Sequence, residues 1–358
     1  MASTAAQLSS KLLTQQGYLK VLEQRKWLQN LLHTFTLEAD KSVEKPVASP
    51  IVLPYGSIIS GTSFRDGDAD YAVVFSAADE IAHKYNNVVI ERERQEKVLA
   101  DLFSHIRQNN SSVDLQPQRI FRARMPIVQY VRKSPEGDSK FDLSLSIDGL
   151  KNTLLLRSYM VGDPRLRLGI LCAKQWGREH QVLNARRGWI SPYALTIMYI
   201  YFMKATGRTQ LYISEDDIAE RVKVIVDIVG GTGGKLEDVE EFASILPFDD
   251  VDTSIVQQDV HEFFNFYGDP SCFDFDVSVV DIRSRDRFAT KDEWCEAIKD
   301  LGEEDRWHLL GHENVLLRDP FEPHSLGRSV DFFRGEEMRE KFRTAALKRD
   351  ALSFLSPA

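Results

Sequence analysis

Two short stretches decide the fold of this chain: Gly56-Ser57, which ends the apolar run PIVLPYGS, and DADYAVVF at 68–75. On a β-strand, side chains at positions i and i+2 point to the same face, so Asp68 and Asp70 are predicted to project together. Two neighbouring carboxylates repel each other unless a cation lies between them. Carboxylate oxygens are the ligands that Mg²⁺ and Mn²⁺ prefer. The second stretch therefore predicts a strand that carries a metal site, although acidic pairs are also common on solvated strand edges.

A glycine and a serine upstream of this strand strengthen the interpretation. Gly56 lets the backbone approach a phosphate closely, and backbone N–H groups together with the Ser57 hydroxyl can cradle it. A third carboxylate, Asp142, lies in the strand-like segment FDLSLSI. If the two strands are neighbours, three carboxylates can hold two divalent ions, one to activate an attacking hydroxyl and one to hold a triphosphate.

Length and composition are those of a two-domain globular protein. The chain has 358 residues, 43% of them hydrophobic and 28% charged, and about 100–200 residues is usual for one domain. No segment approaches the roughly 18 uninterrupted apolar residues of a membrane span, so no membrane partner is expected. The three cysteines, Cys172, Cys272 and Cys295, are far apart, which argues against disulfides and against a structural zinc site.

The charge balance limits how the chain can bind RNA. A net charge of −9 means that nucleic acid is not held by the charge of the whole molecule, so any contact must be local. One candidate is the acid-free stretch from Leu115 to Pro135, and a solvated strand face is an equally good interpretation. Its basic residues are Arg119, Arg122, Arg124, Arg132 and Lys133.

The pattern of strands and helices predicts an α+β, bi-domain protein. We expect helices at 1–48, a mixed-sheet domain at 49–147 and a mainly helical domain at 148–358, with the N-terminal helices packed on the helical domain. Asp163-Pro164 has the form of an N-cap and first turn before RLRLGILCAKQWGREH. The glycine-rich run at 230–234 lacks a preceding strand and a GK[ST] signature, so it is predicted to be a connector and not a phosphate loop.

The first twenty residues bear on the compartment. They contain no acid and are rich in Ser, Thr and Ala, as in transit segments, although they also contain no Arg. The alternatives are a mitochondrial location and, with these residues as an ordinary amphipathic helix, a cytoplasmic one.

Taken together, these motifs resemble the DNA polymerase β-type nucleotidyltransferases. The segment from Lys151 to Phe202 resembles the central part of the poly(A) polymerase-like RNA terminal nucleotidyltransferases, and RDPFEPHSLGR resembles their nucleotide-recognition motif. The resemblance spans about 55 to 330. Without a domain inserted in its catalytic half, the chain looks most like the small kinetoplastid terminal uridylyltransferases.

The resemblance implies roles for residues outside the three carboxylates. Lys174 and Arg178, at i and i+4 on one predicted helix face, match positions that grip the β- and γ-phosphates. Tyr193 matches the aromatic residue that stacks on the base. Further substrate-binding matches are Asn152 and Thr153 for ribose and phosphate, Arg124 beside the catalytic site, and Arg328, which closes the recognition motif.

Base choice depends on Asp319 and Glu322. Uracil presents an N3–H donor where cytosine and adenine present only ring-nitrogen acceptors, so a carboxylate suits uracil, directly or through water. Exocyclic amines are donors too, so the acidic pair alone is also compatible with ATP and CTP. His324 matches the base-selecting His of some relatives ambiguously, because the segment before Gly327 is one residue short.

Two further departures concern the phosphates. Gly67 stands where the family has Ser before the first Asp, and Pro192 stands where it has Ser before the stacking Tyr. Ser57 and Ser191 are the substitutes that we expect to contact phosphate.

The resemblance implies an RNA uridylyltransferase that transfers UMP from UTP to the 3′ hydroxyl of single- or double-stranded RNA, with two Mg²⁺ or Mn²⁺ ions. It further implies a role in RNA processing or RNA editing and a protein complex of the editosome kind. The alternatives are an RNA adenylyltransferase and an inactive RNA-binding scaffold subunit.

Overall fold

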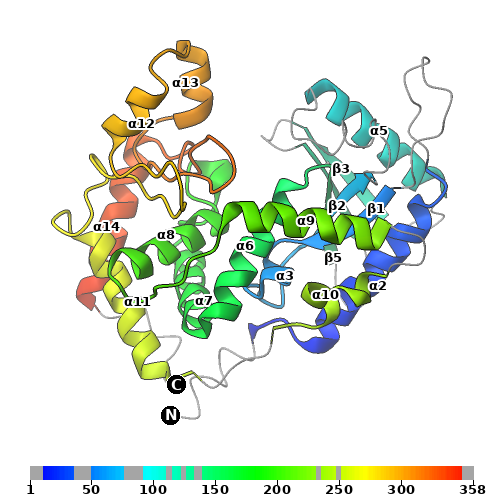
Figure 1. Ribbon diagram of the computed structural model, residues 1–358, viewed down its shortest axis with the longest axis horizontal. Helices are drawn as coiled ribbons and strands as arrows, with labels where there is room; N and C mark the ends of the chain where they lie inside the picture. The colour runs from blue at the N-terminus through cyan, green and yellow to red at the C-terminus, as the bar shows by residue number, and fades with distance from the viewer. Residues whose placement is uncertain are drawn as a thin grey trace. The chain divides into compact units, whose positions relative to one another are not determined.

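The computed structural model describes residues 11–35, 50–75, 92–109, 115–121, 126–132, 139–230, 235–246 and 251–348 (Figure 1). The chain forms two compact units. The sheet unit comprises the described parts of Leu12–Arg157 and Asp216–Pro247. The helical unit comprises Ser158–Glu215 and the described parts of Met1–Lys11 and Phe248–Ala358. An α+β, bi-domain fold is therefore confirmed.

A five-stranded mixed sheet is the centre of the sheet unit, with the strand order β1-β2-β5-β4-β3. Only β2 and β5 run parallel among the described pairs, and the other neighbours are antiparallel. The strands are β1 (Pro50–Tyr55), β2 (Ala69–Phe75), β3 (Leu115–Ile120), β4 (Ile127–Arg132) and β5 (Ser139–Ser144). The expected contact between the DAD strand and the FDLSLSI strand is thus confirmed.

One face of this sheet is covered by α2 (Gln15–Leu32) and α5 (Arg92–Asn109) (Figure 1). Tyr71, fully buried on β2, donates its hydroxyl to Val21 O at 2.9 Å and to Gln24 Oε1 at 3.0 Å. The prediction that the N-terminal helices pack on the helical domain is wrong for α2. Its apolar spacing indicated which face is buried but did not say which partner buries it.

Residues far along the chain complete the sheet unit. They form α9 (Glu215–Gly230), the 3₁₀ turn η2 (Leu236–Asp238) and α10 (Glu240–Ala243). The buried Tyr18 hydroxyl donates to Phe242 O at 2.9 Å, and Arg221 forms a bidentate pair with Glu241 at 2.6 and 2.7 Å. The expected connector at 230–234 lies outside the described residues apart from Gly230, the last residue of α9.

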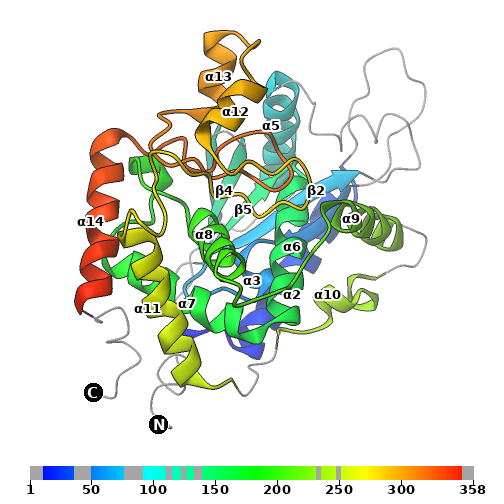
Figure 2. The same cartoon turned by 60° about the vertical axis from the view of Figure 1, so that its left-hand side comes forward.

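Long helices build the helical unit. They are α7 (Pro164–Glu179), α8 (Pro192–Ala205), α11 (Thr253–Gly268) and α14 (Phe332–Lys348), and α6 (Asp148–Gly162) precedes them along the chain. Asp163 caps α7, as predicted, because its side chain accepts from Arg165 N. Figure 2 shows α11 beside α14, where Trp176, Phe264 and Phe342 form an aromatic core with ring centroids 4.5–5.9 Å apart.

A smaller hydrophobic cluster lies beneath two short helices, α12 (Lys291–Ala297) and α13 (Glu303–Leu310). It contains Val279, Trp294, Leu310 and Leu316. The remaining short elements are α3 (Ser57–Ser60) and the 3₁₀ turn η1 (Ala185–Arg187). Within the described part of the chain, no helix has the length and apolar character needed to cross a bilayer.

Candidate active site

A row of polar side chains crosses the sheet. Tyr55 on β1 pairs with Asp70 on β2, Asp70 with Asp142 on β5, and Asp142 with Gln129 on β4. Residues in register on adjacent strands share one face of a sheet, so the two carboxylates lie next to each other on the same face. Asp68 immediately precedes β2 and is exposed.

A nearby positive charge would stabilise the carboxylates of this row. Burial, and after it the charges of Asp142 and Asp68, raises the pKa of Asp70 to about 8. Asp142 accepts a hydrogen bond from Gln129 Nε2 at 2.9 Å. Burial and the nearby Asp70 charge also raise the pKa of the Tyr55 hydroxyl well above its usual value. A cation beside Asp70 and Asp142 would relieve this repulsion and favour the ionised form of Asp70.

A glycine turn closes one end of the row. Gly56 has φ +80° and ψ −156°, and a Cβ at this position would collide with the Asp70 carboxylate. Thr153 fixes the turn, since its Oγ1 accepts from Gly56 N at 2.7 Å and donates to Gly149 O at 2.5 Å. Only glycine meets both requirements of this position. The structure therefore gives Thr153, expected to contact substrate, an anchoring role that the sequence did not reveal.

The departure at Gly67 has a local cause. A Cβ on Gly67 would collide with Ser63 Oγ, which donates to Phe64 O at 2.9 Å. Ser63 is buried, and Gly67 N bonds to Phe64 O at 3.1 Å. A residue with a side chain at position 67 could not keep this turn unless Ser63 moved.

The donor set suits hard divalent ions. Within the residues that the structure describes, no group of three or more His, Cys, Asp or Glu side chains is arranged to hold a metal. The paired Asp70 and Asp142 carboxylates, with Asp68 near enough to raise the pKa of Asp70, nevertheless offer the oxygens that Mg²⁺ or Mn²⁺ takes. These residues fit the expected ions, which would draw the three carboxylates together.

In the helical unit, α7 presents two basic side chains. Lys174 is buried whereas Arg178 is exposed. Burial, and to a smaller extent the charge of Arg178, lowers the pKa of Lys174 from 10.5 to about 8. Lys174 and Arg178 are one turn apart on α7, at positions i and i+4, and a polyanion beside them would favour both charges.

At the start of α8, Ser191 has a role that the sequence did not predict. Ser191 is the N-cap of α8 and its Oγ accepts from Ala194 N at 3.0 Å. Pro192 occupies the first turn, where its missing N–H costs nothing. The expected phosphate contact of Ser191 thus competes with a capping role, because the same oxygen caps the N-terminus of α8.

Tyr193, the candidate for base stacking, lies near Asp319 of the nucleotide-recognition motif. Burial, and after it the charge of Asp319, raises the pKa of Tyr193 well above its usual value. Asp319 is buried, and its Oδ1 accepts from Phe321 N at 2.9 Å and Glu322 N at 3.0 Å. Glu322 Oε2 lies 3.4 Å from Nδ1 of the buried His324. Asp319 therefore shapes the turn that presents Glu322.

Behind this motif lies a buried ion pair that sequence reasoning missed. Arg318 Nη1 is 3.7 Å from Asp281 Oδ2, and its guanidinium stacks 4.1 Å from the Phe288 ring centroid. Asp281 is fully buried and accepts from Arg283 N and Phe288 N. The only signal in the sequence was the charged pair RD at 318–319, which does not reveal burial.

The remaining candidates divide between the two units. Arg124 lies outside the described residues. Arg328 donates to His308 O at 3.1 Å, at the end of α13. The sheet unit holds Asp68, Asp70, Asp142, Gly56, Ser57, Asn152 and Thr153, and the helical unit holds Lys174, Arg178, Ser191, Tyr193, Asp319, Glu322 and Arg328.

Comparison with known proteins identifies related sequences. Residues 6–161 match the family model "Poly(A) RNA polymerase, mitochondrial-like, central palm domain". Terminal uridylyltransferase cid1 of Schizosaccharomyces pombe is 24% identical over 318 residues, which cover 86% of this chain and 70% of that protein. Poly(A) RNA polymerase GLD2 of Homo sapiens is 29% identical over 150 residues, 42% of this chain and 29% of the relative.

Solved structures share the fold over nearly the whole chain. Terminal uridylyl transferase 4 from Trypanosoma brucei with bound dUTP superposes with a TM-score of 0.69 at 18% identity, covering 98% of both chains. RNA Editing TUTase 1 from Trypanosoma brucei, in complex with the UTP analog UMPNPP, has a TM-score of 0.68 at 16% identity, covering 100% of this chain and 86% of that one.

Proposed function

We propose that this chain, whose residues 6–161 match a poly(A) RNA polymerase central palm domain, is a terminal nucleotidyltransferase that transfers UMP from UTP to the 3′ hydroxyl of RNA with the help of two divalent ions. The observation that carries the proposal is the register of Asp70 with Asp142 across two parallel strands, with Asp68 beside them. Burial and the neighbouring carboxylates raise the pKa of Asp70, so the ionised groups repel each other unless a cation lies between them.

In the proposed reaction the chain's own residues position the ions and the substrates. Asp68, Asp70 and Asp142 would hold the ions, which would supply a lower pKa for the attacking 3′ hydroxyl and charge stabilisation for the leaving pyrophosphate. Gln129 orients Asp142 through its hydrogen bond, and the Gly56 turn brings backbone against the Asp70 carboxylate.

The triphosphate is assigned to Lys174 and Arg178. Charge-assisted hydrogen bonds to phosphate are strong, and the phosphates would return the lowered pKa of Lys174 toward its usual value. This assignment is supported by the positions of the two cations, which are one turn apart on α7.

The base is assigned to Tyr193 and Glu322. Tyr193 would stack on the ring, and Glu322 would accept from uracil N3–H directly or through water. Asp319 is assigned to the turn before Glu322, since two backbone N–H groups bind its Oδ1. A base that offers no N3–H leaves the acceptor without its partner and loses about 1–3 kcal/mol.

A second candidate, RNA adenylyltransferase activity, is favoured by the 29% identity to poly(A) RNA polymerases. Nucleotide competition separates the two. The purified chain is incubated with Mg²⁺, a short RNA and equimolar UTP, ATP, CTP and GTP, and the added nucleotide is identified. We expect UMP to dominate by at least tenfold; preferred AMP addition would establish the second candidate, and no addition of any nucleotide would leave the scaffold interpretation.

A further inference from the structure

Two adjacent phenylalanines are exposed where α14 begins. Phe332 is 62% exposed and Phe333 is 80% exposed, and their ring centroids are 5.8 Å apart at an interplanar angle of 79°. Contact of two aromatic rings with water is energetically unfavourable, and such an exposed pair often marks a binding surface. Neither residue belongs to the candidate active site.

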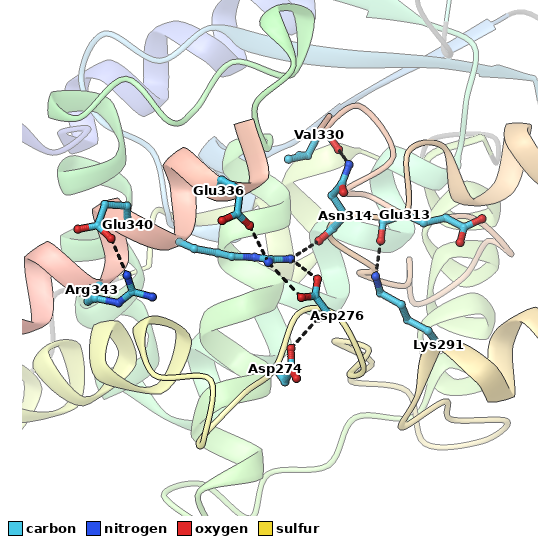
Figure 3. A network of polar contacts seen from close by, with 10 residues as sticks. Asp274, Asp276, Lys291, Glu313, Asn314, Val330, Glu336, Glu340 and Arg343 are labelled. Carbon is cyan, nitrogen blue, oxygen red and sulfur yellow. Dashed lines mark hydrogen bonds and ion pairs between the residues drawn. The ribbon is translucent and has the colours of Figure 1, made fainter. Parts of the chain in front are cut away.

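The helix that carries the pair is held firmly. The Arg339 guanidinium donates to the Asp276 and Glu336 carboxylates, at 2.8 Å to each, and to Asn314 O at 3.3 Å. Figure 3 shows Asp276, Glu336 and Asn314 gathered in this network. The Asn314 side chain in turn donates to Val330 O at 3.1 Å. Because both sides of the junction before α14 are bonded, the exposure of the rings reflects a fixed backbone.

A second segment joins this surface. Ser329 Oγ donates to Trp189 O at 3.1 Å, which ties the turn that contains η1 to the start of α14. The Trp189 ring lies 5.0 Å from the Arg334 guanidinium and 5.5 Å from Lys341 Nζ. On η1 itself, Arg186 and Arg187 are exposed. Although Trp189 itself is buried, the exposed arginines of this turn and the exposed phenylalanines at the start of α14 therefore lie on one face of the helical unit.

The local charge is opposite to that of the chain. Residues 184–189 and 328–347 carry seven basic and four acidic side chains, and Asp276 adds a fifth acid beside Arg339, whereas the whole chain has a net charge of −9. Acidic side chains pair with Arg334, Arg339, Lys341 and Arg343, so the positive excess lies on Arg186, Arg187 and Arg328. The basic stretch at 115–135 is a weaker candidate, because the Arg119 guanidinium lies over the Phe103 ring at 4.4 Å from its centroid and Arg122, Arg124 and Lys133 lie outside the described residues. The positive excess thus coincides with the exposed rings.

We propose that this face binds single-stranded RNA, with bases stacked on Phe332 and Phe333 and phosphates on Arg186 and Arg187. Aromatic rings stack with every base, and basic side chains along the same surface follow the backbone without reading sequence. The proposal rests on the proposed function only in taking RNA as the acceptor. It names a second RNA-binding surface outside the active site.

The test measures RNA binding by the full chain, without nucleotide and in EDTA, so that it does not depend on catalysis. The probe is a fluorescein-labelled 15-nucleotide oligouridylate, followed by anisotropy at about 50, 100 and 200 mM salt. The variants are the double substitutions Phe332→Ala with Phe333→Ala, and Arg186→Ala with Arg187→Ala. Tyr212→Ala, at a 60% exposed aromatic position in the same unit, is the matched control.

We expect the Phe pair variant to weaken binding at least tenfold at every salt concentration with an unchanged salt slope. The Arg pair variant should weaken binding most at low salt and reduce the slope by about 0.7 for each phosphate that it no longer binds. Tyr212→Ala should bind like the wild type. Unchanged RNA affinity in the Phe pair variant would overturn the proposal and leave the face to a protein partner. Normal RNA binding by this face together with no nucleotide addition would instead remove the proposed function alone.

Discussion

Replacing Asp70 by Asn isolates the electrostatic cost of the row that crosses the sheet. The pKa of Asp70 rises from its ordinary 3.8 to about 8 in the folded protein. The folded state therefore holds the proton more tightly than the unfolded state, and the free energy of unfolding falls as the pH rises from about 4 to about 8. Asn carries no charge at any pH, so the stability of the variant does not fall in this way.

The magnitude follows from the same pKa. The full difference corresponds to an upper bound of about 6 kcal/mol for a group shielded from water. Because the Asp70 side chain is only half-buried, solvent screens the repulsion and we expect about 1–3 kcal/mol. At pH 8.5 in EDTA, Asp70→Asn should be more stable than the wild type by this amount, and near pH 5 the two should be similar.

Divalent ions should reverse the difference. Mg²⁺ at a hundredfold excess over its dissociation constant would stabilise the wild type by about 2.7 kcal/mol and the variant by less. Urea unfolding at pH 5, 7 and 8.5, with EDTA or Mg²⁺, measures each difference. Glu23→Gln, on the exposed face of α2 in the same unit, is the matched control. Identical pH dependence in Asp70→Asn and wild type, or equal Mg²⁺ stabilisation of both, would refute the reasoning.

Three further predictions concern the candidate site. Asp142→Ala should abolish nucleotidyl transfer while circular dichroism stays that of the wild type; more than a tenth of the wild-type rate would contradict its role as a metal ligand. Gly56→Ala should lower the free energy of unfolding by about 1–3 kcal/mol and remove activity, since φ is +80° and the new methyl group meets Asp70; unchanged urea unfolding would contradict this. Lys174→Ala and Arg178→Ala should each weaken UTP binding by about 1–3 kcal/mol in calorimetry and leave uridine binding unchanged, and equal losses for both ligands would place the pair in helix packing.

Sequence patterns predicted the parts of this molecule that depend on local periodicity. The alternation around Asp70 and the apolar segment around Asp142 were enough to predict two strands, and the Asp163 cap follows from local chemistry. That the two strands are neighbours, which a shared polar face requires, was only a condition of the prediction and is met in the structure. Packing partners were not predictable in this way. The helix α2 shows an apolar stripe, but nothing in that stripe distinguishes a sheet from a helical domain as its neighbour.

Side-chain roles were the hardest to predict from residue type. A Ser or Thr hydroxyl can bind phosphate or backbone equally well, and the structure gives Ser191 and Thr153 backbone partners. The collision that Gly67 avoids with Ser63 depends on a turn geometry that one sequence does not reveal. Burial of the Arg318–Asp281 pair likewise depends on two segments 37 positions apart in the numbering.

Asp216–Pro247 returns to the sheet unit after part of the helical unit. This connection affects the order in which the protein can fold during synthesis. A ribosome releases residues from the N-terminus onward, so all five strands emerge long before Phe242, whose carbonyl receives the Tyr18 hydroxyl, and before Glu241, which pairs with Arg221. Until then the apolar side chains that these residues cover are open to solvent and to aggregation. The sheet unit can therefore be completed only after α7 and α8 have been synthesised, when Asp216–Pro247 follows them.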